Sequence, residues 1–330
     1  MVLYFFSIFF VYVFIFITGF HDEGSLIATI ISSKSLSPIS VFLVACISQF
    51  AGTMIIGNKV ARTMAFGIIK IQYITGNNIY AIIASGLIGA ILWNIITWCY
   101  CIPSSSSHAI VGGIMGPFVV CFGFKVLNIH SILFMILLPL FMSPVIGYAI
   151  GYWMMKFGNF ICTRFSVNIN KLFKDMHIIT LILINMEQGS NDAQKGLGII
   201  LMLMISRYSS SSIALPLDVK FITALMISSG LIMGGYRMIK SIGTKIYKVK
   251  PFHSINAQLS ALLIIFAASK IGVPISGTQV VNSSIVGVGA AERPNAVGWE
   301  YVQNMIIGWF ITIPCSFLIS SAIYMVLRHL

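Results

Sequence analysis

Charged residues are scarce in this sequence: Asp, Glu, Lys and Arg together make up 8% of the 330 residues, and only eight residues are acidic. A soluble domain carries roughly 25% charged residues. Hydrophobic residues make up 58% of the chain, in runs of about 15 to 24 residues that are long enough to cross a bilayer as helices. The composition excludes a soluble domain and predicts an all-α polytopic membrane protein.

Motifs typical of enzymes are also missing from the sequence. We find no nucleotide-binding loop, no metal-ligating cluster and no Ser–His–carboxylate set with supporting context. The six cysteines lie mostly in apolar segments, and the CxC spacing of Cys99 and Cys101 fits neither a redox pair nor a zinc site. We therefore expect no enzymatic activity and no cofactor, and we interpret the cysteines as packing residues.

The charges that are present are mostly positive, with 20 basic residues and a net charge of +12. In a soluble protein this excess would indicate a nucleic-acid partner. Here the basic residues gather in two short segments, 156–174 and 237–250, which positive-inside reasoning places in the cytoplasm. We expect these segments to contact membrane lipids and not nucleic acid. Attraction of an anionic substrate is the alternative role.

Eight apolar spans follow one another along the chain. They lie near residues 2–20, 39–57, 79–101, 131–155, 177–206, 219–236, 255–272 and 303–327. The first lacks the positive start and the cleavage site of a signal peptide, so we expect it to be retained as a transmembrane helix. Two shorter segments, 104–120 and 275–290, are rich in Ser and Gly and each follows a proline.

The two halves of the chain resemble each other. Asp22 aligns with Asp192 and Pro103 with Pro274, at nearly the same offset, and "IPSSSSHAIVGGIMG" then lies over "VPISGTQVVNSSIVG". Loop 237–250 is much more basic than its counterpart in the first half, which indicates that the two repeats are inverted. The predicted parts are a first transmembrane repeat, a basic cytoplasmic linker and a second transmembrane repeat, over 1–155, 156–175 and 176–330.

Four acidic residues lie inside or beside the apolar spans: Asp22, Glu23, Glu187 and Asp192. Ionisable groups at membrane depth are costly to bury and are usually functional. Asp22 and Asp192 occupy equivalent repeat positions, which favours a role in a site. Glu23 and Glu187 lack that symmetry, and a structural role is as plausible for them.

The polar stretch "QGSNDAQKGLG", residues 188–198, interrupts an apolar span. An unbroken helix facing lipid would not tolerate it, so we expect a broken helix whose freed backbone at Gly189 lines a cavity. The oxygens of Asn191 and Asp192 are hard ligands suited to a small cation.

The segments "PSSSSHAIVGG", 103–113, and "PISGTQ", 274–279, have the pattern of helix starts. Proline is well placed at a first helical turn, where free N–H groups and the helix dipole favour anions. In inverted repeats, two such helix starts would meet near the membrane midplane and form a cradle for a tetrahedral oxyanion. His108 either binds that anion, carries a proton or serves as a structural hydrogen-bonder. Gln49 and Gln258 are polar residues whose plainer role is hydrogen bonding between helices.

Six motifs together resemble the inorganic phosphate transporter (Pit) family of secondary carriers. They are "GFHDEGSLIAT", "GNKVART", "PSSSSHAIVGG", "GSNDAQKGLGII", "GGYRMIKSIGTKI" and "GVPISGTQ". The resemblance implies two inverted repeats with broken helices and re-entrant hairpins. It also implies phosphate symport with sodium ions or protons, and a homodimer.

The motifs and the resemblance together define a set of candidate site residues. The candidates for substrate binding are Asp22, Ser104, Ser105, Ser106, Ser107, His108, Asn191, Asp192, Ser276, Thr278 and Gln279. The candidates for ion coupling are Asp22, Glu23, Ser25, Gln49, Glu187, Asp192 and Gln258. A sodium ion is expected at Asp22, Ser25, Asn191 and Asp192, if sodium is the coupling ion.

The sequence also departs from the family pattern. Ser25 stands where the family usually has Asn, Gln188 and Gln279 stand in place of His, Gly277 in place of Thr, and Gln258 in place of Glu. We predict a secondary active transporter that imports phosphate across the cytoplasmic (inner) membrane by alternating access. The departures leave two alternatives: a carrier of sulfate or a related oxyanion, and a membrane protein that binds an anion without transporting it.

Overall fold

The computed structural model describes residues 1–330 except 34, 75–78, 101, 163–168, 209–213 and 329–330, so part of the predicted linker 156–175 lies outside the described residues. The helices of the first half are α1 Val2–Asp22, α2 Gly24–Ser32, α3 Pro38–Ile55, α4 Lys59–Gly67, α5 Ile79–Cys99, α6 Ser106–Phe122, α7 Ile129–Ser131 and α8 Leu138–Cys162. Those of the second half are α9 Ile169–Tyr208, α10 Leu217–Lys245, α11 Pro251–Ile271, α12 Gly277–Glu292 and α13 Trp299–Leu327. Short helical turns η1 Ile71–Tyr73, η2 Phe124–Val126, η3 Ile132–Leu137 and η4 Pro294–Ala296 complete the described structure.

Seven of the described helical segments are long and apolar enough to cross a membrane. Large apolar side chains point outward from them, including Phe9, Ile47 and Leu318, which are each more than half exposed. A helix surface of this kind is stable only against lipid or another apolar surface. The prediction of an all-α membrane protein is confirmed. Helix α9 is not among the seven, because its polar centre lowers its hydropathy.

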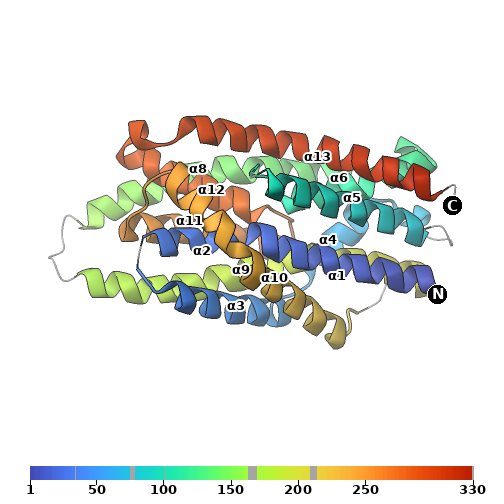
Figure 1. Cartoon of the computed structure of the whole chain (residues 1–330), viewed down its shortest axis with the longest axis horizontal. Helices are drawn as coiled ribbons and strands as arrows, with labels where there is room; N and C mark the ends of the chain where they lie inside the picture. Colours follow the sequence, from blue (N-terminus) through green and yellow to red (C-terminus); the bar gives the residue numbers. More distant parts are fainter. Residues whose placement is uncertain (34, 75–78, 101, 163–168, 209–213, 329–330) are drawn as a thin grey trace.

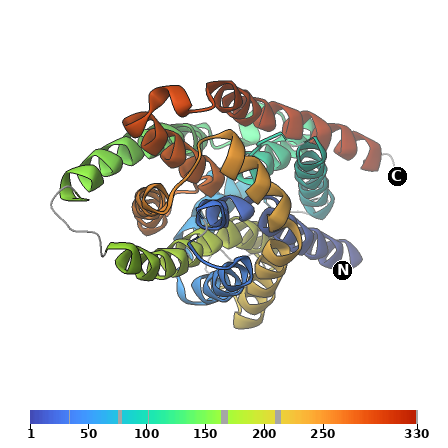
Figure 2. The ribbon, with the colours of Figure 1, turned by 60° about the vertical axis from the view of Figure 1, so that its left-hand side comes forward.

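The two halves of the chain run in opposite directions. In Figure 1, α1 begins at the right-hand end of the molecule, whereas α9, its counterpart in the second half, begins at the left-hand end. The packing between the halves is reciprocal: α1 packs on α10 as α9 packs on α3, and α6 packs on α13 as α12 packs on α8. In Figure 2, α8 and α13 lie along one side, opposite α3 and α10. Two inverted repeats are thus interlocked around a shared centre.

Glycines make this reciprocal packing possible. A Cβ atom on Gly52 of α3 would lie 2.1 Å from the carbonyl oxygen of Met186 in α9. In the other half, a Cβ atom on Gly230 of α10 would lie 2.2 Å from the carbonyl oxygen of Phe16 in α1. Small residues allow backbones to approach closely, as at many helix contacts in membranes. The same close crossing between the repeats therefore occurs twice, with the glycine once on α3 and once on α10.

The structure corrects one expectation about α9. The helix continues through Gly189 from Ile169 to Tyr208, so the predicted break at Gly189 is wrong. Gly189 instead lets α9 approach α3, because a Cβ atom there would lie 2.2 Å from Cγ of Gln49. The polar side chains of residues 188, 190–192, 194 and 195 are all buried. They face other helices and not lipid, and an unbroken helix can therefore carry them.

These contacts predict that alanine at Gly52 destabilises the protein. Its methyl group would overlap the α9 backbone, which cannot rotate away, and overpacking typically costs about 1–3 kcal/mol. Gly57 provides a matched control, because a Cβ atom there would meet no atom within 4 Å. Thermal unfolding of the purified proteins should show a lower Tm for Gly52→Ala than for Gly57→Ala. Equal Tm values would contradict the close crossing of α3 and α9.

Candidate functional site

Two helical hairpins reach the centre of the molecule from opposite ends, α5 with α6 and α11 with α12 (Figure 1). The second helix of each hairpin begins three residues after the proline that the sequence pattern places in its first turn: α6 starts at Ser106 and α12 at Gly277. Ser105 caps α6, since its hydroxyl accepts a hydrogen bond of 3.4 Å from the His108 N–H. The tip residues before both helices are buried. Each hairpin thus presents a helix N-terminus, with its free N–H groups, inside the protein.

The two hairpin tips contact each other directly. The hydroxyl of Ser105 donates to that of Ser276 at 2.9 Å, and Ser276 lies 2.9 Å from the hydroxyl of Thr278. One turn further along, the side-chain amide of Gln279 donates to Nδ1 of His108 at 3.2 Å. The sequence predicts that these two segments meet, and they do so through the predicted residues. The hydroxyls that could bind an anion here are hydrogen-bonded to one another.

Asp22 lies at the N-terminus of α6. Helix α1 ends at Asp22, and α2 starts after the single residue Glu23. One carboxylate oxygen of Asp22 accepts hydrogen bonds from the backbone N–H of Ser106, at 3.3 Å, and from its hydroxyl. The other oxygen accepts from Nδ1 of His21 at 2.6 Å. Asp22 therefore occupies donors that a substrate anion would need.

His21 connects Asp22 to residues of α5 and of the first hairpin tip. Its Nε2 lies 3.4 Å from the hydroxyls of both Thr97 and Ser104, and Ser104 donates to Thr97 at 2.8 Å. Ser104 thus faces α5, whereas Ser105 and Ser107 face the second hairpin. The serine run thus contacts α1, α5, α9 and the second hairpin.

Asp192 forms a buried ion pair with Lys195 one turn along α9. The ammonium group of Lys195 also donates to the hydroxyl of Ser107, at 2.5 Å, and to the carbonyl oxygen of Ile275, at 2.7 Å. The side-chain amide of Gln188 donates to the second oxygen of Asp192 at 2.5 Å. Helix α9 is therefore attached to both hairpin tips through a single lysine.

Several buried polar atoms close to these groups have no hydrogen-bond partner among the described residues. They include both carboxylate oxygens of Glu23 and the side-chain amides of Gln49 and Asn191. Glu23 lies in the electrostatic field of Asp22, Asp192 and Lys195. Buried carboxylate and amide oxygens without donors are costly, and a bound cation would satisfy them. The hydroxyl of Ser25 donates to the carbonyl oxygen of Asp22 at 2.9 Å, which leaves its own oxygen lone pairs free for a cation.

Two of the candidates for ion coupling lie outside this cluster. Glu187 is half-buried and lines a separate cavity of about 310 Å³ between α9 and α11. Gln258 is buried and hydrogen-bonded at both ends, to Thr180 at 2.6 Å and to Thr29 at 3.0 Å. Its contacts match the plainer role of joining helices.

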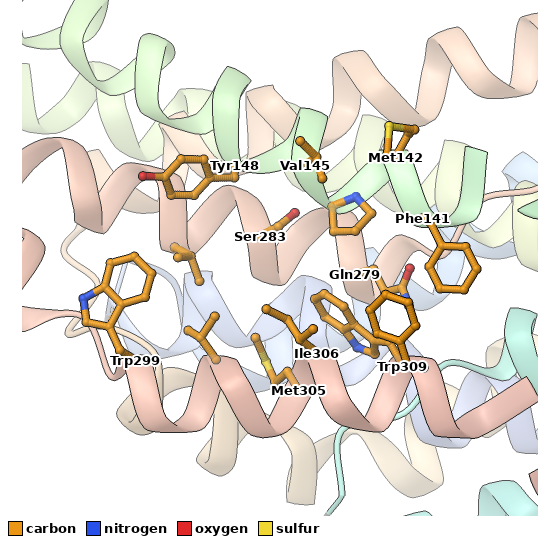
Figure 3. Close-up of a pocket in the computed structure, with 14 residues that line it drawn as sticks. Phe141, Met142, Val145, Tyr148, Gln279, Ser283, Trp299, Met305, Ile306 and Trp309 are labelled. Carbon is orange, nitrogen blue, oxygen red and sulfur yellow. The ribbon is translucent and has the colours of Figure 1, made fainter. Parts of the chain in front are cut away.

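A cavity of about 440 Å³ opens beside the hairpin tips, between α8, α12 and α13 (Figure 3). Figure 3 shows aromatic and aliphatic side chains around most of it, including Tyr148, Trp299 and Trp309. Gln279, the partner of His108, is one of its few polar lining residues. A desolvated oxyanion would find few donors there. The hairpin tips are therefore the better candidate for an anion site.

The model of the Phosphate transporter family matches the chain over residues 18–170 and 161–320. The chain belongs to this family. It is 38% identical to a "Probable low-affinity inorganic phosphate transporter" of Bacillus subtilis, over 95% of this chain and 93% of that one. A protein with the same description from Rhizobium meliloti is 35% identical, over 94% and 92%. A solved structure titled "The sodium-dependent phosphate transporter" has the same fold, with a TM-score of 0.89 at 21% identity over the whole of both chains.

Membership of this family confirms the resemblance seen in the motifs and the prediction of a carrier instead of an enzyme. Sequence reasoning missed two residues of the cluster, His21 and Lys195. Both stand in motifs that carry the resemblance, "GFHDEGSLIAT" and "GSNDAQKGLGII". A buried lysine three residues after a buried aspartate on one helix is itself a signal, since the pair lies on one helix face.

The geometry of this family member also yields a prediction for Gly277. A Cβ atom there would lie 2.0 Å from the side-chain amide atoms of Gln188, which bonds to Asp192. Gly277→Ala should therefore lower the free energy of unfolding by about 1–3 kcal/mol. Adding Gln188→Ala should remove the overlap, and contacting residues typically show coupling energies of about 0.5–3 kcal/mol. Additive losses in thermal or denaturant unfolding would show that the two residues do not touch.

Proposed function

We propose that this protein is a secondary transporter that imports inorganic phosphate by symport with a cation. The observation that carries the proposal is the direct contact between two helix N-termini lined with hydroxyls, at Ser105 and Ser276. Such termini favour oxyanions through their dipoles and free N–H groups. Curated relatives at 38% and 35% identity are named as inorganic phosphate transporters, which supports phosphate as the anion.

In this proposal, phosphate binds by replacing hydrogen bonds between the tips. The hydroxyls of Ser105, Ser276 and Thr278 would turn from one another to the anion, as would the free N–H groups of α6 and α12. Charge-assisted hydrogen bonds to an anion are stronger than those between neutral hydroxyls. Separation of the tips would then accompany binding, which is the motion that alternating access around a central site requires.

Coupling to a cation follows from the place of Asp22. Its carboxylate accepts from the N–H and hydroxyl of Ser106, so it competes with phosphate for the same donors. Two negative groups at one helix terminus repel each other. A proton or sodium ion on Asp22 would remove that repulsion, and Glu23, Gln49 and Asn191 carry further free oxygens for a cation. Binding of the cation and of phosphate would thus favour the same state.

The proposal includes the location of the protein in the cytoplasmic membrane, as a homodimer. The basic segments 156–174 and 237–250 support the membrane orientation. The dimer follows from the family resemblance.

Uptake into proteoliposomes tests the function. Labelled phosphate should accumulate under a sodium or a proton gradient, and the effective gradient identifies the coupling ion. Excess unlabelled sulfate should leave the accumulation intact. Accumulation that sulfate abolishes would contradict a preference for phosphate, and sealed vesicles with folded protein and no accumulation would contradict phosphate symport.

Asp22→Asn should separate binding from coupling. The neutral amide resembles a protonated carboxyl group that cannot release its proton. We therefore expect phosphate exchange between loaded vesicles and medium to persist, while gradient-driven accumulation falls at least about tenfold. Asp175→Asn, which changes an exposed acidic residue, is the matched control and should keep both activities. Full accumulation by Asp22→Asn would exclude Asp22 as a coupling residue.

A further inference from the structure

Lys195 is surrounded by oxygen atoms. Its side chain is 1% exposed, and its ammonium nitrogen contacts the carboxylate of Asp192, the hydroxyl of Ser107 and the backbone carbonyl of Ile275. Carboxylates, hydroxyls and the carbonyls of unwound segments are the kinds of oxygen ligand that hard cations take. The ammonium group therefore stands where a metal cation of the same charge could be held.

The three oxygens come from three different parts of the fold. Asp192 lies on α9, Ser107 on α6 in the first hairpin, and Ile275 in the tip that precedes α12. A cation at this point joins both hairpins to α9. A dissociable ion would make that connection reversible, whereas a lysine side chain makes it permanent.

The first repeat differs at the equivalent position. Because Asp22 aligns with Asp192, Ser25 aligns with Lys195. Ser25, at the start of α2, donates to the carbonyl oxygen of Asp22 at the end of α1. The two aspartates thus occupy equivalent places, but Asp192 has the ammonium group of Lys195 beside it, whereas Asp22 has the imidazole of His21, which is charged only when protonated.

We propose that Lys195 is a tethered cation that takes the place of a dissociable sodium ion between Asp192 and the two hairpin tips. The protein then needs no sodium at this position, and mobile cations act at other oxygens of the site. The consequence of this proposal for transport rests on the proposed function, whereas the cation site itself does not.

Two substitutions separate this role from simple packing. Lys195→Ser removes the charge, opens space and supplies a hydroxyl, and it restores the residue type found at position 25. Lys195→Met also removes the charge, but it fills the space with an apolar chain that offers no oxygen. Lys248→Ser, which changes an exposed lysine in the loop before α11, is the control for the substitution itself.

Thermal unfolding of the purified full-length proteins in sodium chloride and in choline chloride gives the direct test. Sodium should raise the Tm of Lys195→Ser clearly more than that of the wild type, Lys195→Met or Lys248→Ser. A Lys195→Ser protein that folds only in sodium supports the proposal equally. A sodium shift no larger than that of the wild type overturns it. So does a Lys195→Ser protein that folds in neither salt while Lys195→Met folds.

Transport gives a second readout in proteoliposomes driven by a proton gradient. In choline, Lys195→Ser should lose at least about tenfold in phosphate uptake, because a buried carboxylate has lost its partner. Sodium should restore uptake in Lys195→Ser but not in Lys195→Met. Equal restoration in both variants, or none in either, would contradict the tethered cation. If the wild type transports no phosphate, the proposed function fails, and the unfolding experiment still decides the cation site.

Discussion

The structure depends on a contact that is unfavourable by itself, the meeting of two helix N-termini in the interior of a membrane protein. Each terminus carries partial positive charge and free N–H groups, so the two repel unless negative groups lie between or beside them. Asp22 supplies that charge at α6, and Asp192 lies close to the second tip through Lys195. The acidic residues are few because most of the helix surface faces lipid, and these two stand where the termini require them.

The rest of the fold holds this contact in place by symmetry. Each repeat supplies one hairpin, one helix that carries a central aspartate, and the outer helices that pack on the hairpin of the other repeat. Close glycine crossings such as Gly52 on Met186 and Gly230 on Phe16 fix the spacing once in each repeat. Because the repeats are inverted, the contacts that one repeat makes in one access state can be made by the other repeat in the opposite state. The two access states can therefore have similar energies. Lys195, which aligns with Ser25 of the first repeat, adds a charge to the centre that the first repeat lacks at that position.

Sequence patterns predict the architecture well because they reflect strong local constraints. Proline followed by a Ser-containing turn predicts the two helix starts that meet at the centre. Patterns fail where tertiary contacts decide. Gly189 resembles a helix break but serves a close crossing with Gln49, and burial inside the protein keeps α9 continuous. The importance of Lys195 depends on oxygens from two distant hairpins, which no local spacing reveals.

The central claim is that an oxyanion binds between the hairpin tips. Cysteines at positions 105 and 276 test it most directly, since the native hydroxyls lie 2.9 Å apart. In membranes, an oxidant should join Ser105→Cys to Ser276→Cys in one chain, and phosphate should slow that reaction while chloride at equal ionic strength does not. Rapid disulfide formation that phosphate leaves unchanged would contradict the claim, because an anion between the tips must separate the two thiols.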